Sequence, residues 1–207
     1  MQALLIIDVQ PDFMPKGNLP VPDGDTIVPV INQLQPYFDL VVATQDWHPK
    51  NHISFAGNHK NKKEFEVINL EGIQQTLWPI HCVQNTIGAA LHPNLKSESI
   101  EAIFRKGTSI TIDSYSAFYD NAHLKSTGLT GYLKDKGVTE IYFSGLAADI
   151  CVYFSIIDAL NEGFKCNIIT EAVKPLDLEV YKKQQLELLK KGVRYISIDE
   201  FLQNKMS

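Results

Sequence analysis

The feature of the sequence that most restricts the fold is a regular alternation of short apolar runs with amphipathic stretches. The first run, ALLIID at residues 3–8, is continuously apolar, as expected for a strand that is buried on both faces. Residues 25–38 then repeat their apolar side chains at helical spacing, with Asp25 placed to cap the start of the helix. Successive strand–helix–strand units connect through right-handed crossovers, which place helices on both faces of a mainly parallel sheet.

The same alternation continues to the end of the chain. Five more strands are expected at 40–46, 100–107, 140–146, 165–170 and 194–199, and further helices at 127–137, 148–163 and 178–192. We therefore expect a three-layer α/β/α, Rossmann-like fold with a six-stranded, mainly parallel sheet. A chain of 207 residues suits a single domain, 1–207, with an irregular segment at about 47–96 that is rich in His, Asn, Pro and Gly.

Charge and composition argue against several kinds of partner. The net charge of −5 provides no basic surface for nucleic acid. No apolar run approaches the roughly 18 residues of a membrane span, and the N-terminus lacks the basic leader of a signal peptide. The three cysteines are an odd number in a chain without secretory features, which indicates a reduced, cytoplasmic protein. The sequence leaves the oligomeric state open, a homo-oligomer included.

Binding sites in parallel sheets form beyond the carboxyl ends of the strands. Cys151 follows the fourth expected strand, and we expect it in the first turn of the next helix. Unpaired N–H groups there favour a thiolate, lower its pKa and can hold an oxyanion. The position alone leaves two interpretations open: a nucleophile, or a small apolar side chain that packs against the sheet.

A nucleophilic cysteine requires a base and a compensating charge. No histidine ends a strand in the second half of the chain, but Asp8 and Lys106 each end a strand. If the first strand neighbours the fourth, Asp8 points into the same crevice as Cys151, and Lys106 can stabilise both anions. Two other interpretations remain open: Asp8 caps a loop, and Lys106 is an ordinary solvated lysine.

Another group of polar side chains has the composition of a metal site. Asp46 and His48 are two residues apart, so both side chains project from the same side of an extended segment, and His81 comes from the irregular segment. One carboxylate and two imidazoles suit zinc or iron(II) and leave positions open for water or substrate. Asp-x-His is common at strand ends, and His52 competes as a ligand or as a neighbour of the ligands.

Five segments together resemble a known enzyme family in order and over nearly the whole chain. They are LLIIDVQPDFMPKGNLPVPDGD (4–25), VVATQDWHPKNHISFA (41–56), WPIHCVQNTIGAALHP (78–93), FRKGTSITIDSYSAFYDN (104–121) and FSGLAADICVYFSIIDAL (143–160). The chain thereby resembles the nicotinamidase (pyrazinamidase) branch of the isochorismatase-like cysteine hydrolases.

The resemblance implies a catalytic triad of Asp8, Lys106 and Cys151. Asp8 would take the thiol proton and pass it to the leaving ammonia, while Lys106 stabilises the charged pair. The backbone N–H groups of Ala147 and Cys151 would form the oxyanion hole, next to a cis peptide bond between Leu146 and Ala147.

The resemblance also implies one divalent ion on Asp46, His48 and His81; we expect zinc, and iron or manganese also suits these ligands. Phe13 and Trp78 would sandwich the substrate ring, with Tyr115 as a third candidate. The implied reaction is hydrolysis of nicotinamide, and of pyrazinamide, through a thioester acyl-enzyme in NAD salvage. The alternatives are an amidase for another small amide or carbamoyl compound, hydrolysis by a metal-activated water with Cys151 merely structural, and a non-enzymatic binding protein.

Overall fold

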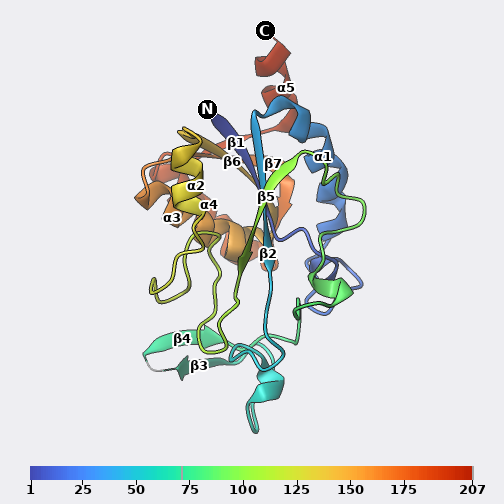
Figure 1. Ribbon diagram of the computed structural model, residues 1–207, viewed down its shortest axis with the longest axis vertical. Coiled ribbons are helices and arrows are strands. Elements are labelled where there is room, and N and C mark those ends of the chain that lie inside the picture. Colours follow the sequence, from blue (N-terminus) through green and yellow to red (C-terminus); the bar gives the residue numbers. More distant parts are fainter. Residues whose placement is uncertain (71, 207) are drawn as a thin grey trace.

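The structure, a computed structural model, describes residues 1–70 and 72–206 and contains a central six-stranded sheet (Figure 1). The strands lie in the order β5-β2-β1-β6-β7-β8, and every neighbouring pair is parallel. They are β1 (Gln2–Ile7), β2 (Leu40–Asp46), β5 (Ile100–Lys106), β6 (Glu140–Leu146), β7 (Lys165–Lys174) and β8 (Arg194–Ile196). The strand order reverses between β1 and β6, which is where an open parallel sheet forms its crevice.

Helices cover both faces of the sheet, so the predicted three-layer architecture is confirmed (Figure 1). One face carries α1 (Ile27–Leu34) and α5 (Ile198–Met206); the other carries α2 (Leu129–Asp135), α3 (Tyr153–Asn161) and α4 (Leu178–Lys190). No helix in the described part of the chain is long and apolar enough to cross a membrane.

The continuously apolar β1 lies between two hydrophobic cores. Ala3, Leu5 and Ile7 pack into the core under α2, α3 and α4, whereas Leu4 and Ile6 pack into the core under α1 and α5. All five side chains are fully buried. The absence of polar alternation in this strand therefore follows from burial on both faces.

Several element boundaries differ from those expected. Asp25 does not cap α1, because a 3-10 turn at Gly24–Thr26 precedes the helix and contains Asp25. The strand expected at 194–199 ends at Ile196, and α5 begins at Ile198. The hydroxyl of Ser197 accepts a hydrogen bond from the Glu200 N–H at 3.1 Å and thereby caps the start of α5.

The irregular segment at 47–96 is less irregular than expected. It contains an antiparallel hairpin of β3 (Val67–Leu70) and β4 (Ile73–Thr76), together with 3-10 turns at Ala56–Asn58 and Ile87–Ala89. Figure 1 shows the hairpin at the end of the molecule toward which β2 runs. The segment therefore lies beyond the carboxyl ends of the strands, where it can cover a site.

Lys106 is the last residue of β5, which is an edge strand of the sheet. Exposed Glu101, Ile103 and Arg105 alternate along β5 with less exposed side chains, and Lys106 itself is buried. Alternation along an edge strand is thus what turns the Lys106 side chain into the interior.

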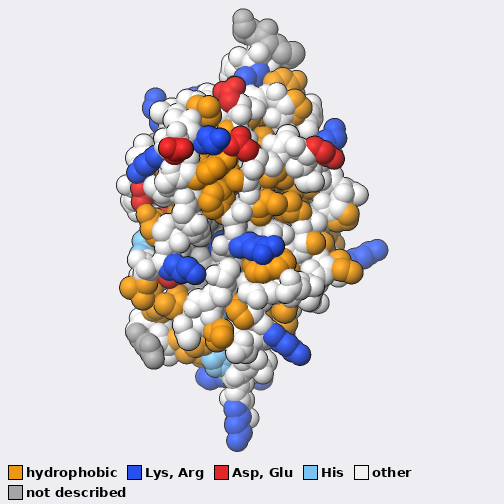
Figure 2. Space-filling view, viewed as in Figure 1, with side chains coloured by type: hydrophobic (Ala, Val, Ile, Leu, Met, Phe, Trp, Pro, Cys, Tyr) orange, Lys and Arg blue, Asp and Glu red, His pale blue; other side chains and the backbone are white. Residues whose placement is uncertain are grey.

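On the face shown in Figure 2, Lys and Arg are spread from top to bottom while Asp and Glu gather mainly in the upper half.

The close approach of β6 to β1 depends on Gly145, which pairs with Ile7 and has a φ of +110°. A Cβ at this position would lie 1.9 Å from the Ile7 carbonyl oxygen. We expect Gly145→Ala to lower the free energy of unfolding by more than about 2 kcal/mol, measured by urea denaturation.

Gly131→Ala in α2 is the matched control. A Cβ there meets nothing within 4 Å, so this change should raise stability by roughly 0.5–1 kcal/mol through helix propensity. Equal effects of the two substitutions would contradict the steric argument.

Candidate active site

A pocket opens at the carboxyl ends of the four strands β5, β2, β1 and β6. Lys106 is the last residue of β5 and Asp46 the last of β2; Asp8 directly follows β1, and Cys151 lies in the turn after β6. The three cysteines are free thiols, and of these Cys151 lines the pocket whereas Cys166 is buried in β7. The residues that the sequence placed at strand ends therefore meet in one place.

The ammonium of Lys106 lies at the centre of this group. Its Nζ lies 2.8 Å from Oδ2 of Asp8 and 2.8 Å from Oδ1 of Asp46, and it donates to Sγ of Cys151 at 3.4 Å. It also donates to the carbonyl oxygen of Ser114 at 3.0 Å, and only 2% of the residue is exposed. Burial alone would lower the pKa of Lys106, but the two carboxylates outweigh it and raise that pKa well above its ordinary value. The interpretation of Lys106 as a solvated lysine is therefore wrong.

Asp8 has a backbone φ of +50°, in the left-handed region that aspartate tolerates better than most residues. The hydroxyl of Thr44 in β2 donates to its Oδ1 at 2.6 Å and accepts from its backbone N–H at 3.2 Å. Burial raises the pKa of Asp8, and Lys106 partly opposes this shift. The carboxylate thus contacts side chains of β2 and β5, which does not fit the alternative role of a loop cap.

Cys151 lies in a π-helical turn, Ala148–Val152, that precedes α3, instead of in the first turn of an α-helix. The peptide bond between Leu146 and Ala147 is cis, as expected, and Ala147 and Cys151 both line the pocket. Burial raises the pKa of the Cys151 thiol well above its ordinary value; Lys106 lowers it, and the Asp8 and Asp46 carboxylates raise it further. The expectation of a lowered thiol pKa is wrong, so the thiol requires a base.

Asp46, His48 and His81 form a buried group of nitrogen and oxygen donors whose ligand atoms lie within 4.8 Å of one another. Oδ2 of Asp46 is 3.0 Å from Nε2 of His48 and 3.4 Å from Nε2 of His81. Burial would raise the pKa of Asp46, but His48 and Lys106 hold it well below its ordinary value. The carboxylate is therefore ionised and faces both imidazoles.

The second ring nitrogen of each histidine contacts a backbone carbonyl. Nδ1 of His48 lies 3.0 Å from the oxygen of Gly107, and Nδ1 of His81 lies 2.8 Å from the oxygen of Pro79. Because a carbonyl only accepts, each Nδ1 donates to it, which leaves Nε2 as the nitrogen of each ring that faces Asp46. Metal-binding histidines are oriented in this way, so the donor set fits a divalent cation.

His52 belongs to a different grouping, with His48 and Asp113. Its Nδ1 lies 2.7 Å from the hydroxyl of Ser54, and its ring is fully buried 4.3 Å from the His48 ring. Burial lowers the pKa of His52 to about 4, so the ring is neutral. The structure therefore places His52 beside the Asp46–His48–His81 group and outside it.

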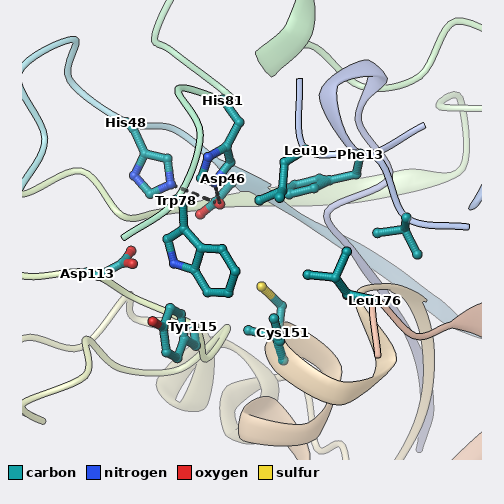
Figure 3. A pocket seen from close by; sticks show the side chains of 13 residues that line it. Phe13, Leu19, Asp46, His48, Trp78, His81, Asp113, Tyr115, Cys151 and Leu176 are labelled. Carbon is teal, nitrogen blue, oxygen red and sulfur yellow. Dashed lines mark hydrogen bonds and ion pairs between the residues drawn. The ribbon is translucent and has the colours of Figure 1, made fainter. Parts of the chain in front are cut away.

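Aromatic and aliphatic side chains form the rest of the pocket (Figure 3). The three positions expected to hold a substrate ring, Phe13, Trp78 and Tyr115, all line it, and Trp78 and Tyr115 meet edge to face at 6.1 Å. In Figure 3 the thiol of Cys151 points into the space in front of Trp78, with Leu176 on its other side. The pocket, its mouth included, encloses about 390 Å³, which suits a small planar molecule.

Several residues of the site were missed by sequence reasoning. Asp113 and Leu176 line the pocket. Gln10 holds the backbone of Asp46: its Nε2 donates to the Asp46 carbonyl at 2.8 Å and its Oε1 accepts from the Asp46 N–H at 2.9 Å. Gln75 in β4 donates to Oδ2 of Asp113 at 3.0 Å and to the hydroxyl of Tyr115 at 3.1 Å. Amide side chains carry no sequence signal for such partners, because the contacts are distant in sequence.

The chain matches the family model of the isochorismatase domain over residues 2–200. It is 47% identical to a nicotinamidase of Acinetobacter baylyi, covering 94% of this chain and 92% of the relative. A nicotinamidase of Escherichia coli is 44% identical, covering 86% of this chain and 85% of the relative.

Solved structures show the same likeness. The nicotinamidase/pyrazinamidase of Acinetobacter baumanii has a TM-score of 0.92 at 48% identity, covering 95% of both chains. PnC1 of L. infantum in complex with nicotinate has a TM-score of 0.86 at 34% identity, covering 97% of this chain and 94% of the other. A zinc complex of the Pyrococcus horikoshii pyrazinamidase has a TM-score of 0.79 at 35% identity, covering 95% of this chain and 99% of the other. With a family model that spans almost its whole length and a fold shared with these proteins, the chain belongs to the isochorismatase family.

Proposed function

We propose that this protein hydrolyses nicotinamide to nicotinate and ammonia. The observation that carries the proposal is the contact of one buried lysine with Asp8, Asp46 and Cys151, at a thiol that faces an aromatic pocket. The pocket combines a nucleophile, a base, and donors for a cation in a space suited to one ring. Relatives at 44% and 47% identity that are nicotinamidases support this choice among amides.

In the first half of the proposed reaction, Asp8 accepts the proton of the Cys151 thiol. The thiolate sulfur then bonds to the carboxamide carbon, and the backbone N–H groups of Ala147 and Cys151 stabilise the oxyanion. As the carbonyl re-forms, the carbon–nitrogen bond breaks and the amide nitrogen takes the proton from Asp8, so ammonia leaves. Lys106 remains cationic throughout and compensates the charge that moves between Asp8 and Cys151.

In the second half, a water molecule attacks the thioester carbon and gives one proton to Asp8. The carbon–sulfur bond breaks, the sulfur regains that proton, and nicotinic acid is released and ionises to nicotinate. The cycle consumes one water and restores the free thiol. A chemistry that depends on a free thiol suits a reducing compartment, and we place the protein in the cytoplasm, with a role in NAD salvage.

Asp46, His48 and His81 would hold a divalent cation, which we propose to be zinc. When bound, this ion would supply a Lewis acid for the pyridine nitrogen of the substrate. Phe13 and Trp78 would flank the ring, and Tyr115 would contact Trp78 at the pocket wall. Pyrazinamide has a ring nitrogen at the same place relative to its carboxamide, so we propose it as a second substrate.

An ammonia-release assay that compares nicotinamide, pyrazinamide and a carbamoyl substrate tests the proposed function. We expect turnover of both heteroaromatic amides. Turnover of the carbamoyl compound alone would instead identify an amidase for another class of small amide.

Replacement of the nucleophile separates the thioester route from hydrolysis by a metal-activated water. We expect Cys151→Ala to lower kcat for nicotinamide by about 10³-fold or more, because no other thiol lines the described pocket. Circular dichroism should show an intact fold. Cys166→Ala, in the buried strand β7, is the control and should keep wild-type turnover. Near-normal turnover by Cys151→Ala would contradict the proposed thioester route.

The acid side of the pH–rate profile should report Asp8. Burial raises the pKa of Asp8 above its ordinary value of 3.8. As the pH falls through this raised pKa, Asp8 becomes protonated, can no longer act as the base, and turnover falls. The Thr44 hydroxyl lowers that pKa by donating to Oδ1. Thr44→Val should therefore move the acid limb to higher pH, by on the order of one unit. A limb that stays in place would contradict the assignment of Asp8 as the base.

The metal proposal is best tested at His81, because Asp46 also pairs with Lys106. We expect His81→Ala to lose bound metal, measured by mass spectrometry after dialysis, and to raise KM for nicotinamide. His123→Ala, at an exposed position, should retain both properties. Full turnover by wild-type protein stripped of metal with a chelator would show that the cation is dispensable.

A further inference from the structure

Asp149 is a buried carboxylate that the proposed reaction does not use. It lies in the π-helical turn two residues before Cys151, and only 4% of it is exposed. Its Oδ1 accepts a hydrogen bond from the Leu176 N–H at 2.7 Å, and its Oδ2 accepts one from the Asp177 N–H at 2.9 Å. Each carboxylate oxygen therefore holds one amide of the connection between β7 and α4.

A third hydrogen bond joins the same turn to α4 itself. Nε2 of Gln184 donates to the backbone oxygen of Asp149 at 3.0 Å. Residue 175 is a proline and has no N–H, so Leu176 and Asp177 supply the first amides that follow β7 in this connection. The nucleophile turn and the β7–α4 connection are thus linked through a single residue.

Leu176 is the member of this connection that lines the substrate pocket. Figure 3 shows its side chain beside Cys151, across the pocket from Trp78. A substrate ring held in front of the thiol would therefore contact Leu176 on one side. Contact with an aliphatic wall contributes to the binding of a ring in proportion to the apolar area removed from water.

We propose that Asp149 is a positioning residue that holds Leu176 in place as a wall of the substrate pocket and thereby sets KM. The kinetic part of this inference rests on the proposed nicotinamidase function; the structural part does not. Hydrogen bonds from amides to a carboxylate are among the strong ones, so their loss frees the connection. None of these bonds involves Asp8 or Lys106, so we expect these two groups to keep their positions.

Hydrogen exchange provides a test that needs no substrate. In the wild-type protein, the amides of Leu176 and Asp177 should be protected from exchange. Asp149→Asn keeps the size of the side chain but replaces one acceptor oxygen with an NH₂ group, so exchange at these two amides should become about tenfold faster or more. Wild-type amides that exchange as fast as those of an exposed loop would overturn the proposal, even if the variant does not fold.

Steady-state kinetics with nicotinamide tests the consequence for binding. We expect Asp149→Asn to raise KM by about tenfold while kcat changes much less, because the wall contributes to substrate binding and not to the chemical step. Leu176→Ala should also raise KM. If Asp149 acts through Leu176, adding Asp149→Asn to Leu176→Ala should raise KM little further, which a double-mutant cycle measures.

Asp177→Asn is the matched control, because Asp177 lies in the same connection and caps α4 by accepting from the N–H groups of Glu179 and Val180. It should lower the melting temperature and leave KM unchanged. A lower kcat with unchanged KM in Asp149→Asn would overturn the inference by showing that Asp149 acts on the nucleophile. A wild-type protein without nicotinamide turnover would contradict the proposed function, while hydrogen exchange would still decide on the link to Leu176.

Discussion

The ion cluster around Lys106 is the interaction on which the rest of the site depends. A buried ammonium is tolerated only when it is paired and hydrogen-bonded, because removing it from water is otherwise costly. Here Asp8 and Asp46 provide the pairing, and each comes from the end of a different strand. The contact with Cys151 adds the turn after β6. One charge thereby fixes the relative positions of four chain segments.

Two carboxylates around one ammonium leave an excess of negative charge. Burial is the main cause of the raised pKa values of Asp8 and Cys151, and the charge of Asp46 adds to it. The more deeply paired Asp46 stays ionised, since it also faces His48, while the pKa of Asp8 and that of the Cys151 thiol both rise. A divalent cation held by Asp46 and the two histidines would reduce this excess. Asp46 therefore couples the proposed metal site to the proposed nucleophile, and neither group is electrostatically independent of the other.

Much of the fold and of the site could be predicted from the chain itself. Short apolar-rich runs identified the strands, and polar residues at their ends identified Asp8, Asp46 and Lys106. The hairpin β3–β4, the π-helical turn at Cys151 and the roles of Gln10, Gln75 and Asp149 could not be predicted in this way. The roles of the three side chains depend on hydrogen bonds between residues 27 to 40 positions apart in the sequence. The hairpin and the π-helical turn are local geometries that do not require a particular sequence.

The sequence by itself determined the kinds of groups that are present and the edge of the sheet at which they gather, because periodicity specifies strands and parallel strands end on one side. Only the tertiary structure decided which of these groups touch and what their protonation is. A strand end specifies a position to within several ångströms, whereas an ion pair requires atoms at 2.8 Å, and a pKa depends on burial and on every charge nearby. For that reason Cys151 could be recognised as a candidate nucleophile from its place in the chain, while its raised pKa became apparent only once its burial and the carboxylates beside it were known.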